Sequence, residues 1–118
     1  IIDYFIERNI RLIIFLPPFA PYIWTVMEKT QNYAYIDFLD KELKKLCTQN
    51  GVIYFNFSSP KLIDYTDDEM LDGFHGSERV YAKILLQMGE LKPEINDIIR
   101  SDLLMNKLRN NNDLNIFN

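Results

Sequence analysis

The chain has 118 residues, of which 47% are hydrophobic and 25% are charged, and its formal net charge is -4. This balance is typical of one folded domain, so it excludes wholesale disorder and argues against a second domain. The negative charge and the lack of clustered Lys and Arg argue against nucleic acid as a partner. The longest apolar run is too short for a membrane span.

The first eight residues have the pattern of the end of an amphipathic helix. Apolar side chains recur at helical spacing, at Ile1, Ile2, Phe5 and Ile6. Asn9 is placed to end the last turn. Because the chain begins inside a helix, and with Ile rather than Met, we expect it to be a piece of a longer protein.

Two continuous β-branched and aromatic runs, at 11–16 and 52–57, predict strands. Such runs are typical of strands buried on both faces, as in a parallel sheet. The first run ends at Pro17 and Pro18, because proline cannot donate to the hydrogen-bond ladder, and Ser58 follows the second. With a helix between them the strands form a βαβ unit, so they are parallel and their carboxyl ends meet at one edge.

The segment between the strands contains one clear helix, at 33–49. Its apolar stripe consists of Ile36, Leu39, Leu43, Leu46 and Cys47. We expect the Cys47 thiol to be buried and inert, and Gly51 to supply a left-handed stop. The connection at 17–31 is rich in aromatic residues, with a helical turn predicted from Pro21 onward. Ligands bind after strand ends in α/β sheets, although covering the core is the simpler role for these aromatic residues.

Two more helices are predicted after the second strand. One starts at the cap residue Ser77 and ends at Gly89, and the next starts at Pro93. The polar end of the chain is expected to fray. The fold class is therefore α/β, with about two strands plus flanking helices. We divide it into an α/β part at 1–90 and a C-terminal helix with a frayed tail at 91–118.

Two strands alone do not make a stable open sheet. We therefore expect missing strands, a second copy of the chain, or an extra pairing from 62–65 or from the tail. On this basis the isolated chain is predicted to self-associate, as a dimer or a strand-exchanged assembly.

The stretch at 67–78 comes closest to indicating a function. It contains the only histidine, His75, and Asp72 lies three residues before it. An imidazole works as a general base near neutral pH when a carboxylate fixes its tautomer and stabilises its cation. Gly73 leaves the backbone free to bend the carboxylate back onto the ring. The other acids, at 67–69, are expected only to solvate the approach.

These residues resemble the last conserved block of the SGNH hydrolases, the GDSL-type esterase and lipase superfamily, in which Asp-Gly-x-His precedes the final helix. The runs at 13–18 and 52–57 also look like strands of that family, so the resemblance spans roughly residues 1–88. It implies that the chain is part of a three-layer, flavodoxin-like parallel sheet with flanking helices. By the same resemblance His75 is the general base and Asp72 is its orienting partner.

The resemblance further implies hydrolysis or transfer of an ester or acetyl group through an acyl-enzyme intermediate, without a cofactor. The substrate would be a small ester or an acetylated carbohydrate. Candidate substrate contacts at the sheet edge are Pro18, Phe19, Ser58 and Phe74. The family's serine motif and its oxyanion glycine and asparagine are not visible here. Either the serine lies upstream of Ile1 or the chain is a relative that binds without reacting.

Two alternatives compete with this interpretation. The first is a non-catalytic α/β interaction module of a larger surface or carbohydrate-modifying protein, with Phe19, Tyr22 and Trp24 as an exposed contact patch. The second is a metal site, since several side chains could supply oxygen or imidazole ligands. These are Asp64, Asp67, Asp68, Glu69, Asp72 and His75. Their spacing matches no calcium loop, so no metal is predicted.

Overall fold

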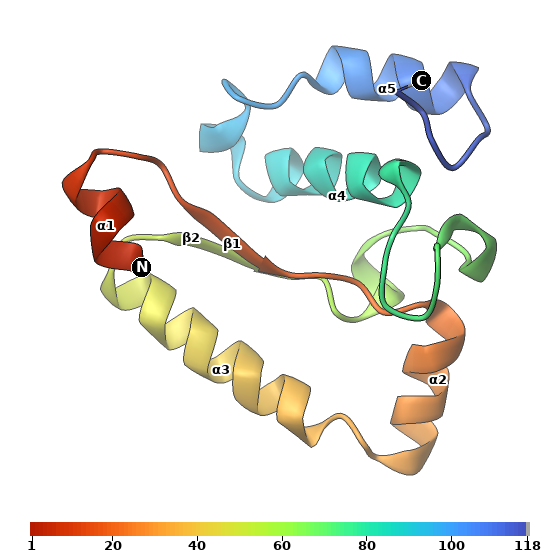
Figure 1. Cartoon of the computed structure of the whole chain (residues 1–118), viewed down its shortest axis with the longest axis horizontal. Coiled ribbons are helices and arrows are strands. Elements are labelled where there is room, and N and C mark those ends of the chain that lie inside the picture. The colour runs from red at the N-terminus through yellow and green to blue at the C-terminus, as the bar shows by residue number, and fades with distance from the viewer. Residues whose placement is uncertain (118) are drawn as a thin grey trace.

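The computed structural model describes residues 1–117, which fold around two short parallel strands flanked by helices (Figure 1). In chain order the elements are α1 (Ile2–Glu7), β1 (Ile13–Leu16), α2 (Pro21–Thr30), α3 (Ala34–Gln49), β2 (Ile53–Asn56), α4 (Glu78–Leu91) and α5 (Ser101–Asn110). Short 3-10 turns lie at Pro60–Leu62, Asp67–Glu69 and Pro93–Ile95. The predicted α/β class is confirmed. No helix within this part of the chain is both long and apolar enough to cross a membrane.

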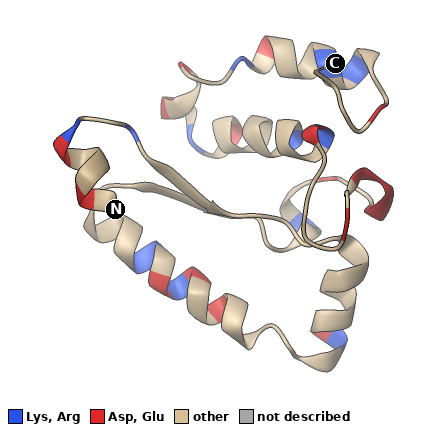
Figure 2. Cartoon of the chain, in the orientation of Figure 1, with Lys and Arg blue, Asp and Glu red and all other residues tan. Residues whose placement is uncertain are grey.

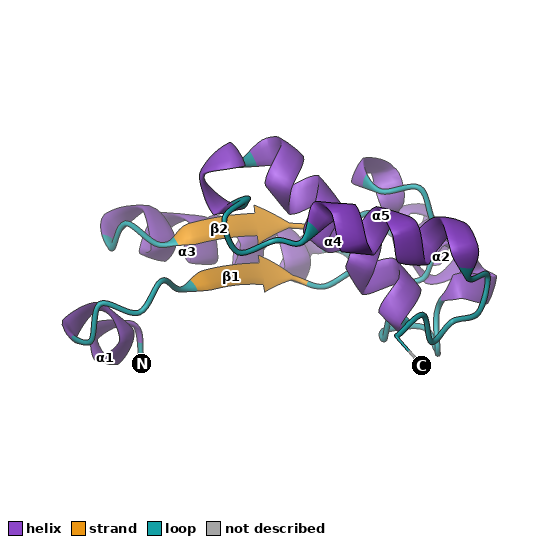
Figure 3. Cartoon of the chain, turned by 90° about the horizontal axis from the view of Figure 1, so that it is seen from above, coloured by secondary structure: helices purple, strands orange, loops and turns teal. Residues whose placement is uncertain are grey.

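The two strands pair in parallel, as their sequences predict. Ile13 lies opposite Ile53, and the register runs without a break to Leu16 opposite Asn56. Figure 3 shows the two arrows side by side and pointing the same way. Contact continues past the strands, because the Phe19 amide donates to the carbonyl oxygen of Ser58 at 3.2 Å. The two carboxyl ends therefore stay together as one edge of the molecule.

Helices lie on both faces of this pair of strands, with α3 on one side and α4 on the other (Figure 1). Towards α4 the core is aromatic and aliphatic, with the rings of Phe55 and Phe57 stacked at 5.6 Å and packed near Ile84 and Met88. Alternate residues of a strand point to the same face, which places both phenylalanines on this side.

The α3 helix covers the other face incompletely. Ile36 and Cys47 are buried, so the prediction of a buried thiol is confirmed. Leu39 and Leu46 belong to the same predicted apolar stripe but are more than a third exposed. Two short strands offer too little surface to cover the whole apolar stripe of a helix of 16 residues, so part of that stripe stays exposed.

The connection after β1 is more helical than predicted, because α2 is a full helix of 10 residues. The sequence of this aromatic-rich connection predicts only a helical turn from Pro21 onward. The first turn is completed from elsewhere in the chain, since the Asp67 carboxylate accepts the Tyr22 amide at 2.9 Å. A partner 45 residues away supplies the capping group, and local sequence does not reveal it.

The C-terminal third departs from prediction in two places. Gly89 does not end α4, which continues to Leu91. A Cβ at this position would come too close to the side-chain oxygen of Asn96, so that side chain would have to shift. Near the end of the chain, Ile116 is fully buried and packs with Leu104 of α5. The helix expected from Pro93 is a single 3-10 turn, and α5 starts eight residues later.

The expected extra strand pairing is not present within residues 1–117. The sheet has two strands, and the residues at 62–65 pair with neither of them. One further bridge exists, an antiparallel pair between Met70 and Gly76. Both outer edges of the sheet are thus open in the described part of the chain.

Candidate functional site

The acidic stretch folds into a closed loop between the carboxyl edge of the sheet and α4. We call residues 66–77 the dyad loop. The antiparallel bridge between Met70 and Gly76 closes it, and the Leu71 amide donates to the His75 carbonyl at 2.8 Å. The four residues from Asp72 to His75 therefore form the tip of a tight turn.

Asp72 and His75 are in direct contact at this tip. The Nδ1 atom of His75 lies 2.8 Å from Oδ2 of Asp72 and 3.0 Å from Oδ1. Oδ1 also accepts the backbone amides of Phe74 at 2.7 Å and His75 at 2.9 Å. A carboxylate on Nδ1 places the proton of the neutral ring there, which leaves Nε2 as a hydrogen-bond acceptor. This is the arrangement that a general base requires.

The pKa of the Asp72 carboxyl is lowered from its ordinary value of 3.8, first by the Phe74 amide and then by the His75 ring. We therefore expect carboxyl carbon NMR to give a pKa for Asp72 below 3.8. In His75→Ala it should rise but stay lowered, because the Phe74 amide still donates. A pKa at or above 3.8 in the unmodified chain would contradict the geometry. Stability linked to this carboxylate is lost as pH falls through the lowered value.

Asp67 and Glu69 do more than solvate the approach, which corrects the expectation from sequence for these two acids. Figure 2 shows the acids at 67–69 gathered in the 3-10 turn at the base of the dyad loop. Asp67 caps α2, as described above, and the Ala20 amide donates to the Gly73 carbonyl at 3.0 Å. Glu69 pairs with Arg79 at 2.7 Å and with Lys83 at 2.7 Å. The loop is thus fixed to α2 and to α4.

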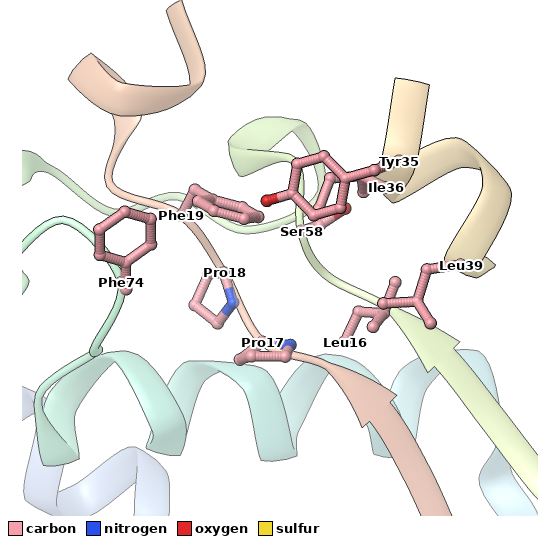
Figure 4. Close-up of a pocket in the computed structure, with 9 residues that line it drawn as sticks. All are labelled: Leu16, Pro17, Pro18, Phe19, Tyr35, Ile36, Leu39, Ser58 and Phe74. Atoms are coloured by element: carbon pink, nitrogen blue, oxygen red, sulfur yellow. The ribbon is translucent and has the colours of Figure 1, made fainter. Parts of the chain in front are cut away.

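An apolar pocket of about 220 Å³ adjoins the dyad loop (Figure 4). Its lining residues are Leu16, Pro17, Pro18, Phe19, Tyr35, Ile36, Leu39, Ser58 and Phe74. The structure brings together all four predicted substrate contacts here, with Phe74 and Leu39 at opposite ends in Figure 4. The rings of Phe19 and Phe74 meet edge to face at 5.6 Å. Phe74 precedes His75 directly, which links the pocket to the dyad.

Sequence reasoning missed the part of the pocket wall that α3 supplies. Tyr35, Ile36 and Leu39 line the pocket from the first turns of this helix. Ile36 and Leu39 fit the apolar stripe of an ordinary core helix, so their spacing carries no separate signal. Tyr35 lies beside that stripe and is exposed, and only the tertiary fold brings it to the sheet edge.

Two of the four serines, Ser58 and Ser77, are buried and have structural partners. The Ser58 hydroxyl donates to Oδ1 of Asn56 at 2.6 Å, and the residue is only 2% exposed. The Ser77 hydroxyl accepts the Val80 amide as the cap of α4, as predicted. Within residues 1–117, His75 has no hydrogen bond to a serine hydroxyl. The described residues therefore contain a hydrogen-bonded pair of Asp72 and His75 but no serine hydroxyl joined to it.

The structure also bears on the two alternative interpretations, the interaction module and the metal site. Of the expected aromatic patch only Tyr22 is well exposed, because Phe19 packs against Trp24 at 6.1 Å and against Phe74. No group of three or more His, Cys, Asp or Glu side chains within residues 1–117 is placed to hold a metal ion. Of the acids considered as ligands, Asp67 and Asp72 accept backbone amides, and Glu69 pairs with Arg79 and Lys83.

Comparison of the chain with models of known families, with curated proteins and with solved structures finds no match.

Proposed function

We propose that this chain is the C-terminal part of an SGNH-like serine hydrolase that cleaves or transfers an ester or acetyl group. The observation that carries the proposal is the contact between Asp72 and Nδ1 of His75, which leaves Nε2 as an acceptor on the residue that follows Phe74 in the wall of an apolar pocket. On this proposal the two strands belong to a three-layer, flavodoxin-like sheet, and upstream sequence supplies further strands and the nucleophilic serine.

The chemistry that fits these residues is two-step acyl transfer. The serine oxygen attacks the substrate carbonyl while its proton passes to Nε2 of His75. The bond to the leaving alcohol breaks, and His75 returns the proton to that alcohol. Water then attacks the acyl-enzyme, gives a proton to Nε2, and the serine leaves with that proton. Asp72 stabilises the imidazolium in both steps and stays ionised. No cofactor takes part.

The pocket favours an apolar group of the substrate over a sugar. Its walls are the side chains of prolines, leucine, isoleucine and aromatic residues, with the Ser58 hydroxyl already bound to Asn56. A carbohydrate hydroxyl placed there would lose its hydrogen bonds to water without replacement, which is costly. A short acyl chain fits this lining, and an acetylated carbohydrate fits if the acetyl group alone enters.

Labelling with a fluorophosphonate probe tests the proposal. We expect the protein encoded by the complete reading frame to be labelled at a serine outside residues 1–118, because an activated serine is the target of such probes. His75→Ala should abolish that labelling, while Tyr4→Ala, which changes an exposed side chain on α1, should not. Labelling at Ser58 or Ser77, or none at all, would contradict the assignment.

A non-catalytic interaction module is the second candidate. It is favoured by the lack of a serine bonded to His75 within residues 1–117 and by the exposed Tyr35 and Phe38 on α3. Such a module would use those rings, together with the open sheet edges, for self-association or for binding another chain. The labelling experiment separates the two candidates, since this module contains no activated serine.

A further inference from the structure

A nearly buried ion cluster lies at the base of the dyad loop. The Glu69 side chain is 16% exposed, and its carboxylate accepts Nε of Arg79 and Nζ of Lys83, each at 2.7 Å. It also accepts the Thr66 amide at 3.1 Å. Burial raises the pKa of this carboxyl, but the hydrogen bonds from Lys83, Thr66 and Arg79 outweigh that, so the pKa is lowered. Glu69 is therefore a fully satisfied anion with two cationic partners.

The cluster joins the two limbs of the dyad loop. Glu69 is on the limb that leads to Asp72, whereas both cations are on α4, which continues the limb that carries His75. The backbone repeats this link, because the Ser77 amide donates to the Glu69 carbonyl at 3.3 Å. The position of one limb against the other is thus set by side-chain ion pairs as well as by the loop's own backbone.

The Asp72 and His75 side chains have little packing of their own. They are 55% and 71% exposed, so surrounding side chains do little to hold one against the other. Apart from the two backbone amides that Asp72 accepts, their contact depends on the relative position of the limbs to which they are attached. We propose that Glu69 is a positioning residue, whose ion pairs with Arg79 and Lys83 hold the two limbs in the register that places Asp72 on Nδ1 of His75.

The only histidine of the chain makes this testable by NMR. In the ¹⁵N-labelled 118-residue chain at alkaline pH, where an imidazole is neutral, the ring nitrogen shifts report which nitrogen carries the proton. We expect one tautomer, protonated at Nδ1, in the unmodified chain and a mixture in Glu69→Gln. The Leu71 amide, which closes the loop, should exchange about tenfold faster in Glu69→Gln. Asp72→Ala gives the reference for complete loss of the contact.

A control separates positioning from general stability. Leu104→Ala removes packing between α5 and α4 away from the dyad loop, so it should lower the unfolding midpoint while the single tautomer persists. Should Glu69→Gln fail to fold, Lys83→Gln removes one cation and leaves the Arg79 pair, and a partial shift towards the mixture is expected. A single tautomer in both Glu69→Gln and Lys83→Gln would overturn the proposal. An equal shift towards the tautomer mixture in Leu104→Ala would overturn it as well.

A catalytic role for the contact between Asp72 and His75 rests on the proposed function. The measurement of that contact does not. The tautomer and the Leu71 amide are read without substrate or serine. Failure of the fluorophosphonate labelling therefore leaves this inference standing, and failure of the NMR prediction leaves the labelling result standing.

Discussion

Substitution of His75 by Ala is expected to lower kcat for a short-chain activated ester by about 10⁴- to 10⁶-fold in the longer protein that supplies the serine. The reason is that Nε2 of His75 is the proposed acceptor of the serine proton, and Asp72 holds the ring at the opposite nitrogen. His75 is the only histidine among the 118 residues, so this chain has no second imidazole to take that proton. Steady-state kinetics with a p-nitrophenyl ester measure the effect.

Asp72→Asn serves as the graded comparison for that variant. It keeps the size of the side chain but removes its charge, so the ring is oriented less well and its cation is not stabilised. A loss of about 10⁴-fold in kcat is expected, since that is typical for this member of a triad. Tyr4→Ala, which changes an exposed residue on α1, should leave kcat unchanged. Most of the activity persisting in His75→Ala would disprove the assigned role.

The contact at the tip of the dyad loop was predictable from sequence because the hydrogen bonds that bend Asp72 towards His75 are local. An Asp side chain readily bends back onto the backbone two and three residues ahead, and here it accepts the amides of Phe74 and His75. The same bend delivers the carboxylate to the ring. Spacing and residue type alone therefore located the pair, whereas its catalytic role is still a proposal.

The structural role of Glu69 was not predictable in the same way. Its partners Arg79 and Lys83 lie 10 and 14 residues further along the chain and reach it only because α4 packs beside the loop. In sequence, an acid before a helix looks like ordinary dipole placement. The capping of α2 by Asp67 and the pocket wall from α3 were hidden for the same reason.

The strands and α3 could be predicted because hydrophobic pattern decides them. The runs at 11–16 and 52–57 became β1 and β2, shortened at their ends to the residues that pair. At Gly89 the pattern misled, because the same residue type serves both a helix end and a close approach between elements. Ile116 is fully buried although residues 110–113 before it are all polar, and composition alone does not reveal that contact.

Substitution of Phe57 by Ala is expected to lower the free energy of unfolding by about 3–5 kcal/mol. The side chain is fully buried, stacks on Phe55 at 5.6 Å and meets Phe15 edge to face at 6.4 Å. Its removal leaves a cavity between the sheet and α4 that neighbouring rings cannot fill. Domains are typically stable by only about 5–15 kcal/mol, so the loss is a large fraction of the total. Urea denaturation measures it.

Phe38→Ala is the matched control, since it makes the same chemical change at a side chain that is 67% exposed on α3. It should alter the free energy of unfolding by no more than about 0.5 kcal/mol. Equal effects of the two substitutions would mean that the core does not lie between the sheet and α4. Phe57 also directly precedes Ser58 in the pocket wall. Phe57→Leu, which refills most of the cavity, should therefore recover much of the stability and keep the pocket in place.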